Sequence, residues 1–338
     1  MKIMIDAFGG DNSPEEVIAG TLLAIKERED FTAVLVGDED IIKEKLSGYT
    51  FDSSRVEIFD AKDVITCEEE PTVAVRRKPD SSIVKGIKEL KENDEIKAFV
   101  SAGSTGAVLV AATLKLGRIE GISRPALCPA LPTLSGGQVF LTDSGANTDC
   151  KAINLVQFAV MAAVYAEESG IKDPRIALLS NGTEDEKGNA LNHEAFPLLK
   201  GLKGINFIGN MEARDILSGK ADIVVADGFS GNIALKSIEG AAKTVMTAVK
   251  GAITSSLRGK IGGLFVRKPL KGLKDTLDFN NKGGALFLGV NKPVLKAHGS
   301  SKRIAIRNTV LQAVSYAEFD LKDKIKNKLE STGASLLV

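Results

Sequence analysis

Residues 2–16, KIMIDAFGGDNSPEE, combine a strand, a loop and the start of a helix. The apolar run at residues 2–6 predicts a buried strand, and the small and polar residues 7–12 predict a loop. Ser13, Pro14 and Glu16 then predict a helix start. Serine is the expected cap, proline suits the first helical position, and the glutamate completes a capping box. We expect this helix to run to about residue 28.

The same order of strand, loop and helix recurs along the rest of the chain. Residues 72–91, 107–116 and 151–169 are expected to be helical, the first of them broken near Pro79. Such alternation predicts an α/β fold, with a mostly parallel sheet covered by helices on both faces. We expect a single unit over residues 1–338. The further strands are predicted at residues 32–36, 56–59, 97–101, 139–142, 175–179, 205–208 and 222–226.

The composition excludes several classes of protein. The 44 basic and 44 acidic side chains balance, whereas a nucleic-acid-binding protein usually has a basic excess. Three widely spaced cysteines indicate reduced thiols in a cytosol rather than a disulfide framework. The sequence has no signal peptide and no run of eighteen apolar residues, so we expect a soluble protein. Contact with a membrane surface stays open.

Six loops of small and polar residues directly follow predicted strands or short apolar runs. In a parallel sheet such loops share one edge, where ligands of α/β proteins bind. Their free backbone N–H groups and the helix N-termini behind them favour an anion, and we predict a phosphate site. The loops are DAFGGD (residues 6–11), SAGSTG (101–106), DSGAN (143–147), SNGTE (180–184), DGFSGN (227–232) and HGSS (298–301).

The motifs of other site types are missing. The sequence has neither the glycine-rich Rossmann and P-loop patterns nor a zinc-binding arrangement of its two histidines. Carboxylates near the strand ends could hold Mg²⁺, but turn geometry alone is the better explanation, and we predict no metal and no cofactor. These carboxylates are Asp6, Asp11, Asp143, Asp149 and Asp227.

Lys187 is a candidate for the positive charge of the site. It lies in a polar loop between a predicted strand and a helix, where it could approach a phosphate or a developing oxyanion. On spacing alone, a solvated lysine balanced by neighbouring acidic residues is the simpler interpretation.

Residues 243–274 carry eight lysines and arginines and no acidic residue, within a chain of zero net charge. Apolar residues recur every fourth position from Val245 to Ile261 and continue into Leu264 and Phe265, and Gly262-Gly263 is expected to interrupt the helical pattern. We predict a protruding basic amphipathic pair of helices over residues 243–275, suited to an anionic membrane or an acidic partner. The stripe from Val245 to Ile253 is expected to be packed. The predicted membrane contacts are Leu257, Ile261, Leu264 and Phe265.

Taken in order, the motifs of this chain resemble those of the bacterial phosphate acyltransferase family, which makes acyl phosphate from acyl-acyl carrier protein and inorganic phosphate. The resemblance covers nearly the whole chain, and the ordered set is specific although no single motif is. The matching segments are DAFGGD (6–11), KPDSSI (78–83), SAGSTGA (101–107), RPA (124–126), DSGAN (143–147), LSNGTEDEKG (179–188), FIGNMEARD (207–215), DGFSGN (227–232) and KAHGSS (296–301).

This resemblance implies a fold like that of isocitrate and isopropylmalate dehydrogenases and of phosphate acetyltransferase, in a homodimer. It implies a cytoplasmic enzyme held peripherally at the inner face of the membrane. Its product would feed a membrane glycerol-phosphate acyltransferase in phospholipid (phosphatidic acid) synthesis. The implied partners are acyl carrier protein, inorganic phosphate and the membrane.

The expected site residues fall into three groups. Lys187 would neutralise charge, Asn232 would bind the oxyanion or phosphate, and His298 would deliver a proton. The phosphate-binding candidates are Gly103, Ser104, Thr105, Gly106, Asn181 and Gly231, and other expected cleft residues are Asp6, Asp11, Asp143, Asn147 and Asp227.

The chemistry of attack by phosphate on a thioester makes modest demands on these side chains. Phosphate is largely ionised near neutral pH, and a thiol of pKa about 8.5 is a good leaving group, so the enzyme needs mainly orientation and oxyanion stabilisation. Three alternatives stay open. They are a short-chain phosphate acetyl- or butyryltransferase using coenzyme A, a metal-dependent dehydrogenase of the same fold that binds NAD and Mg²⁺, and a non-catalytic membrane scaffold.

Overall fold

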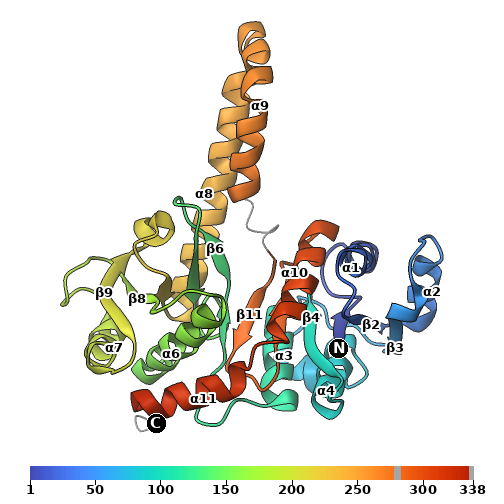
Figure 1. Ribbon diagram of the computed structural model, residues 1–338, viewed down its shortest axis with the longest axis horizontal. Helices are drawn as coiled ribbons and strands as arrows, with labels where there is room; N and C mark the ends of the chain where they lie inside the picture. The colour runs from blue at the N-terminus through green and yellow to red at the C-terminus, as the bar shows by residue number, and fades with distance from the viewer. Residues whose placement is uncertain (278–282, 335–338) are drawn as a thin grey trace.

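The computed structural model describes residues 1–277 and 283–334, which form two β-sheets with helices around them (Figure 1). The α/β prediction is confirmed, but there are two sheets instead of one, and each is mixed. Strand β11 is antiparallel to both of its neighbours, and β6 is antiparallel to β7. The first sheet has the order β3 (Val56–Asp60), β2 (Thr32–Gly37), β1 (Lys2–Asp6), β4 (Ile96–Ser101), β12 (Val294–Lys296), β11 (Ala285–Leu288) and β5 (Ala126–Cys128). The second has the order β6 (Ala130–Pro132), β7 (Gln138–Thr142), β10 (Ile223–Val225), β8 (Arg175–Ser180) and β9 (Asn206–Glu212).

Both faces of the first sheet are buried. Successive side chains of a strand point to opposite faces. Ile3 and Ile5 therefore pack into one apolar cluster, and Met4 packs into another. The helices of this half are α1 (Glu15–Glu27), α2 (Glu39–Leu46), α3 (Pro71–Arg77), α4 (Ser82–Glu92), α5 (Thr105–Ala111), α10 (Arg303–Tyr316), the 3₁₀ turn η1 (Ser53–Arg55) and the π-helical turn η2 (Ala112–Leu116).

The second sheet is built in the same way. Phe140 packs with the large cluster around α6, and its neighbour Leu141 packs with the opposite cluster near the base of α8. Helix α6 is buried along most of its length and also contacts β11 of the first sheet, so it joins the two halves. The remaining elements here are α6 (Ala152–Glu168), α7 (Ala190–Gly201), α11 (Leu321–Thr332) and the 3₁₀ turn η3 (Ala213–Ser218).

The predicted capping box at the start of α1 is wrong. The Ser13 hydroxyl donates a hydrogen bond to the Gly10 carbonyl (2.9 Å) instead of accepting one from the helix. The Glu16 carboxylate accepts from the backbone N–H of Arg303 (2.7 Å) and pairs with its guanidinium. Helices α1 and α10 pack along each other. The Glu16 carboxylate, which the sequence alone assigns to the start of α1, therefore binds a backbone N–H in the first turn of α10.

Helices α8 (Gly228–Thr254) and α9 (Leu257–Leu277) pack side by side and project from the body of the molecule (Figure 1). The chain turns at residues 255–256, and α9 continues through Gly262 and Gly263, so the predicted interruption there is wrong. A Cβ atom on Gly263 would lie 2.8 Å from Ile253 Cγ2. Glycine therefore lets α9 approach α8 closely at this point.

The apolar stripe from Val245 to Ile253, which was expected to be packed, is only partly packed in the described chain. Val245 keeps 59 % of its surface exposed, whereas Val249 and Ile253 are partly buried. Leu264 and Phe265 are 70 % and 82 % exposed, and Ile261 is also exposed. The side chain of Leu257, the fourth predicted membrane contact, lies outside the described residues. Within the described chain, no helix is both long enough and apolar enough to cross a membrane.

Candidate functional site

A cavity of about 350 Å³ lies between the two sheets. Four of the six small-residue loops line it, contributing Thr105, Ser144 with Gly145, Asn232, and His298 with Gly299. The sequence predicts that all six loops share one sheet edge. The structure has two sheets instead, and the loops that line the cavity come from two edges that face each other. The loop of residues 6–11 and the loop after β8 do not line this cavity.

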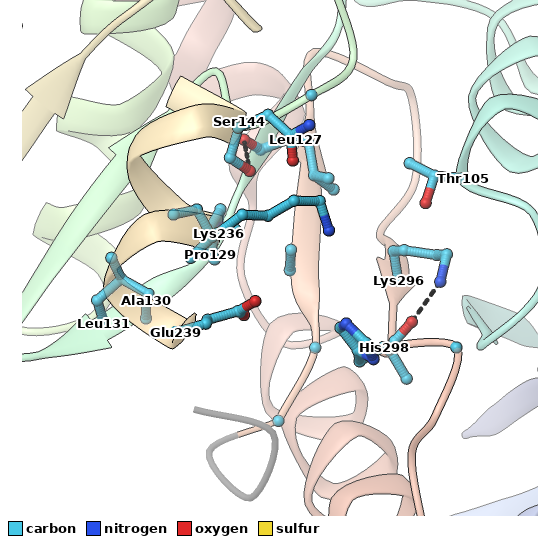
Figure 2. Close-up of a pocket in the computed structure, with 18 of the residues that line it drawn as sticks. Thr105, Leu127, Pro129, Ala130, Leu131, Ser144, Lys236, Glu239, Lys296 and His298 are labelled. Atoms are coloured by element: carbon cyan, nitrogen blue, oxygen red, sulfur yellow. Dashed lines mark hydrogen bonds between the residues drawn. The ribbon is translucent and has the colours of Figure 1, made fainter. Parts of the chain in front are cut away.

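The two walls of the cavity come from different halves of the chain. Figure 2 shows Thr105, Lys296 and His298 on one side, with Lys236 and Glu239 of helix α8 on the other. An apolar portion completes the lining, from Leu127, Pro129, Ala130, Leu131, Leu235, Ala285 and Ala297. The cavity can therefore take a ligand with an apolar part and a polar or anionic part.

Lys296 is the buried cation of this site. It lies at the end of β12 and is only 8 % exposed. Its ammonium donates to the carbonyl oxygens of Ala102 (3.2 Å) and Ala297. Burial lowers the pKa of Lys296 to about 8, and nearby acidic groups, including Asp6, partly oppose that shift.

His298 has a defined ring orientation. The backbone N–H of Ser300 donates to His298 Nδ1 (3.2 Å), and the Ser300 hydroxyl lies 2.9 Å from the same atom. A ring nitrogen that accepts from a backbone N–H carries no proton, so these hydrogen bonds assign the neutral ring's proton to Nε2. His298 Nε2 is then the proton donor available to a ligand in the cavity.

The loop of residues 101–106 contributes to the cavity chiefly through Thr105. The Ser104 hydroxyl caps α5 by accepting from the Ala107 N–H (3.4 Å), and the Gly103 N–H donates to the Ser101 hydroxyl (2.9 Å). Gly106 packs closely on α3, since a Cβ atom there would lie 2.5 Å from Pro71. Gly103, Ser104 and Gly106 thus shape the loop that presents Thr105.

Neither acidic residue of the first loop lines the cavity. Asp6 is fully buried, accepts from the Ser101 hydroxyl (2.6 Å) and from the Phe8 N–H (3.2 Å), and burial raises its pKa. The backbone N–H of Asp11 donates to the Gly299 carbonyl (2.8 Å), which joins this loop to the one that carries His298.

The buried carboxylate of Asp143 organises its own loop and does not line the cavity. Three N–H groups donate to Oδ1, from Leu127 (3.0 Å), Gly145 (3.1 Å) and Ala146 (3.0 Å). Oδ2 accepts from the Asn147 backbone (2.7 Å) and side chain (2.8 Å). Burial raises the pKa of Asp143, while these five donors favour its ionised form.

The start of α8 is fixed against the same loop. Asp227 caps the helix by accepting from the N–H groups of Phe229 (3.0 Å) and Ser230 (2.9 Å). Gly231 donates its N–H to the Asp227 carbonyl (2.9 Å), and a Cβ atom there would lie 1.9 Å from the Asp143 carbonyl oxygen. The Gly231 N–H is therefore engaged inside the helix, and Asn232, the next residue, faces the cavity.

Lys187 and Asn181 lie on the exposed loop between β8 and α7. They do not line the described cavity. Strands β7, β10 and β8 are parallel neighbours, so this loop shares a sheet edge with Ser144, two strands away. At 4.7–4.9 Å per strand, the separation of the two strands is about 10 Å.

Sequence reasoning missed five polar residues of the lining, which are Lys296, Lys236, Glu239, Ser144 and Gln312. Two of them lie inside quoted motifs, Lys296 in KAHGSS and Ser144 in DSGAN, but nothing in the letters separates a buried lysine from a solvated one. Lys236 and Glu239 follow Asn232 at helical spacing and could have been found by extending that face of the helix. Among the described residues, no cluster of three or more His, Cys, Asp or Glu side chains could hold a metal ion.

Known proteins match this chain over nearly its whole length. Residues 1–324 match the family model described as "Fatty acid synthesis protein". The "Phosphate acyltransferase" of Clostridium novyi is 46 % identical over 331 residues, covering 98 % of this chain and 99 % of the relative. That of Thermoanaerobacter pseudethanolicus is 46 % identical over 339 residues, covering 100 % of both.

Solved structures share the fold at low sequence identity. A phosphotransacetylase from Streptococcus pyogenes has a TM-score of 0.63 at 19 % identity, with 94 % of each chain covered. A 4-hydroxythreonine-4-phosphate dehydrogenase from Salmonella typhimurium has a TM-score of 0.51 at 14 % identity, covering 93 % of this chain and 99 % of that one. Together with the full-length relatives, the family match shows that this chain belongs to the phosphate acyltransferase family.

Proposed function

We propose that the protein transfers a fatty acyl group from acyl-acyl carrier protein to inorganic phosphate, giving acyl phosphate for phospholipid synthesis. The observation that carries this proposal is the mixed lining of the cavity. An apolar portion runs from Leu127 to Leu131 and on to Leu235, and a polar portion holds Lys296, Thr105 and His298. A fatty acyl chain suits the first portion and a phosphate dianion suits the second.

The roles follow from what the reaction requires. A phosphate oxygen attacks the thioester carbonyl, and the tetrahedral oxyanion then collapses with loss of the carrier's thiolate. The Asn232 side chain faces the cavity and would donate to the oxyanion or the phosphate. Thr105 would help to seat phosphate at the start of α5, with Ser104 shaping that loop. The Nε2–H of His298 would supply the proton to the departing thiolate.

Lys187 remains a proposed source of charge neutralisation, since its loop shares the sheet edge with Ser144. Replacing Lys187 with alanine is expected to lower turnover by about 10²–10³, as for loss of one preorganised donor. The exposed loop position predicts an unchanged melting temperature. Turnover close to wild type would assign the charge to the cavity residues instead.

The proposal includes the cellular setting. The basic helices α8 and α9, with Leu264 and Phe265 exposed on α9, favour contact with an anionic membrane surface from the cytoplasmic side. A membrane glycerol-phosphate acyltransferase would consume the product, and the functional form is proposed to be a homodimer. We propose that isocitrate and isopropylmalate dehydrogenases share this two-sheet fold.

The direct test is to detect the product. The protein is incubated with inorganic phosphate and a long-chain acyl-acyl carrier protein, and acyl phosphate is trapped with hydroxylamine as the acyl hydroxamate. A parallel series replaces the donor with acetyl-, butyryl- and palmitoyl-coenzyme A. A phosphate-free control measures the direct reaction of the thioester with hydroxylamine, and we expect hydroxamate above this background from the carrier-protein donor when phosphate is present. Preference for short-chain coenzyme A donors would refute the proposed donor, and no phosphate-dependent hydroxamate from any donor would refute the function.

A further inference from the structure

Two lysines four residues apart differ in how their ammonium groups are partnered: Lys292 precedes strand β12, and Lys296 is its last residue. An ammonium group has three N–H donors. The Lys292 ammonium has four acceptors, which are the carbonyl oxygens of Leu90 (2.8 Å), Asn93 (3.2 Å) and Ile96 (3.4 Å) and the carboxylate of Asp94 (3.4 Å). These acceptors engage all three donors, so Lys292 serves to tie α4 to the first sheet.

Lys296 is more deeply buried but has fewer partners. Its ammonium donates to the carbonyl oxygens of Ala102 and Ala297, and these two bonds leave one N–H for the cavity that the residue lines. Among the described residues, no carboxylate lies within ion-pairing distance of it, that is, within 4.0 Å. A buried charge without a direct counter-ion is costly in free energy. The site is therefore electrostatically incomplete without a bound anion.

The carboxylate behind Lys296 is already engaged. Asp6 influences the Lys296 charge, but its oxygens accept hydrogen bonds from the Ser101 hydroxyl and the Phe8 N–H. Thr105 and His298 line the cavity beside Lys296, and Lys236 points into the same space from α8 (Figure 2). Donors and positive charge therefore converge from both walls, as a tetrahedral oxyanion requires.

We infer that Lys296 is the residue that binds the inorganic phosphate substrate, with its unused N–H bonded to a phosphate oxygen. The inference deepens the proposed function and rests on it for the identity of the anion. Lysine suits the task because it acts as a compact point charge, and the two carbonyl groups fix its direction before the ligand arrives.

The charge of Lys296 gives the inference a pH signature. Burial lowers its pKa to about 8, so the ammonium form is lost as the pH rises through 8. Phosphate is already a dianion there, since its second pKa resembles that of phosphate esters, about 6. Affinity for phosphate should therefore fall above pH 8. The titratable and charged groups that face Lys296 are Asp6, Asp11, Cys67, Lys236, Glu239 and His298.

The first test compares Lys296→Met with the matched control Lys292→Met. Methionine is unbranched like lysine and one atom shorter, and it removes the charge in each variant. For Lys296→Met we expect the KM for phosphate to rise roughly ten- to a hundredfold, the range for loss of a charge-assisted hydrogen bond, with the KM for the acyl donor within about twofold of wild type. Lys292→Met is expected to lower the melting temperature without changing the KM for phosphate. An unchanged KM for phosphate in a folded Lys296→Met protein would overturn the inference.

The second test uses the wild-type protein and needs no turnover. Surface and buried amines are acetylated with limiting acetic anhydride at pH 8, with and without inorganic phosphate, and modification is quantified at each lysine by mass spectrometry. We expect phosphate to protect Lys296 and to leave Lys292 unaffected. Protection without acyl phosphate synthesis would support the site and refute the proposed reaction. Synthesis of acyl phosphate without protection of Lys296 would refute the site and leave the reaction standing, even if the Lys296→Met protein fails to fold.

Discussion

Asp143→Asn is expected to destabilise the protein strongly, although the change replaces one oxygen by one nitrogen. The Asp143 carboxylate accepts five hydrogen bonds from N–H groups, three at Oδ1 and two at Oδ2. In the better orientation of asparagine, its NH₂ group replaces Oδ2 and faces the two donors of Asn147. Each buried donor left without an acceptor costs about 1–3 kcal/mol, so the free energy of unfolding should fall by about 2–6 kcal/mol.

The assay is equilibrium unfolding in urea at pH 7, followed by circular dichroism. Asp227→Asn is the matched control, because Asp227 accepts two N–H bonds at the start of α8 and asparagine is as good a helix cap as aspartate. We expect the control to stay within about 0.5 kcal/mol of wild type. If Asp143→Asn is as stable as the control but has lost turnover, the residue acts in the chemistry and the structural role argued here is wrong.

Three further predictions concern the exposed apolar residues of α9, the acid stability and the metal requirement. Replacing both Leu264 and Phe265 with glutamate should release the protein from anionic vesicles, because each nearby Lys or Arg contributes only about 1 kcal/mol of lipid attraction. Turnover should be preserved, and vesicle binding that persists in flotation assays would exclude these two residues as the contact. The Arg303 guanidinium lowers the pKa of Glu16 to about 2, so its contribution is present above the ordinary pKa near 4.5 and is lost as the pH falls towards 2. Urea unfolding of Glu16→Gln should show a loss of about 1 kcal/mol at pH 6 that vanishes near pH 2, and a pH-independent difference would contradict this. Incubation with EDTA should leave hydroxamate formation unchanged, because phosphate is already ionised and the thiolate leaves readily; loss of activity that Mg²⁺ restores would refute a metal-free reaction.

The strands and helices could be predicted where long apolar runs carry a clear period. Strand β1 has the predicted bounds, and the break near Pro79 separates α3 from α4 as expected. The short strands β5, β6, β11 and β12 were missed, because three or four residues give no readable alternation; the equally short β10 was found because its residues are all apolar and β-branched. Those short strands build the facing edges of the two sheets, so their loss also hid the division into two sheets.

The candidate site could be predicted only in part, for a similar reason. Loops of small residues mark the edges of both sheets, and Thr105, Asn232 and His298 were found in this way. The buried Lys296 ammonium donates to carbonyl groups at residues 102 and 297. Residue 102 is far from residues 296 and 297 in sequence and lies beside them only after folding. The same holds for Asp143, whose donors come from two segments and convert an expected cleft residue into a buried anchor.

The order of strands in the first sheet has a consequence for synthesis on the ribosome. Strand β5 ends at Cys128, yet its neighbour β11 begins at Ala285, and β12 is needed to join them to β4. The ribosome must add more than 150 residues before these strands can pair, which takes about 8–30 s at 5–20 residues per second. Throughout that interval β4 presents an unpaired parallel edge, the kind of surface that aggregates. The second sheet lies entirely within the intervening segment and can assemble first. A ribosome stalled before residue 285 would therefore hold a complete second sheet and a first sheet that is still open at the edge of β4.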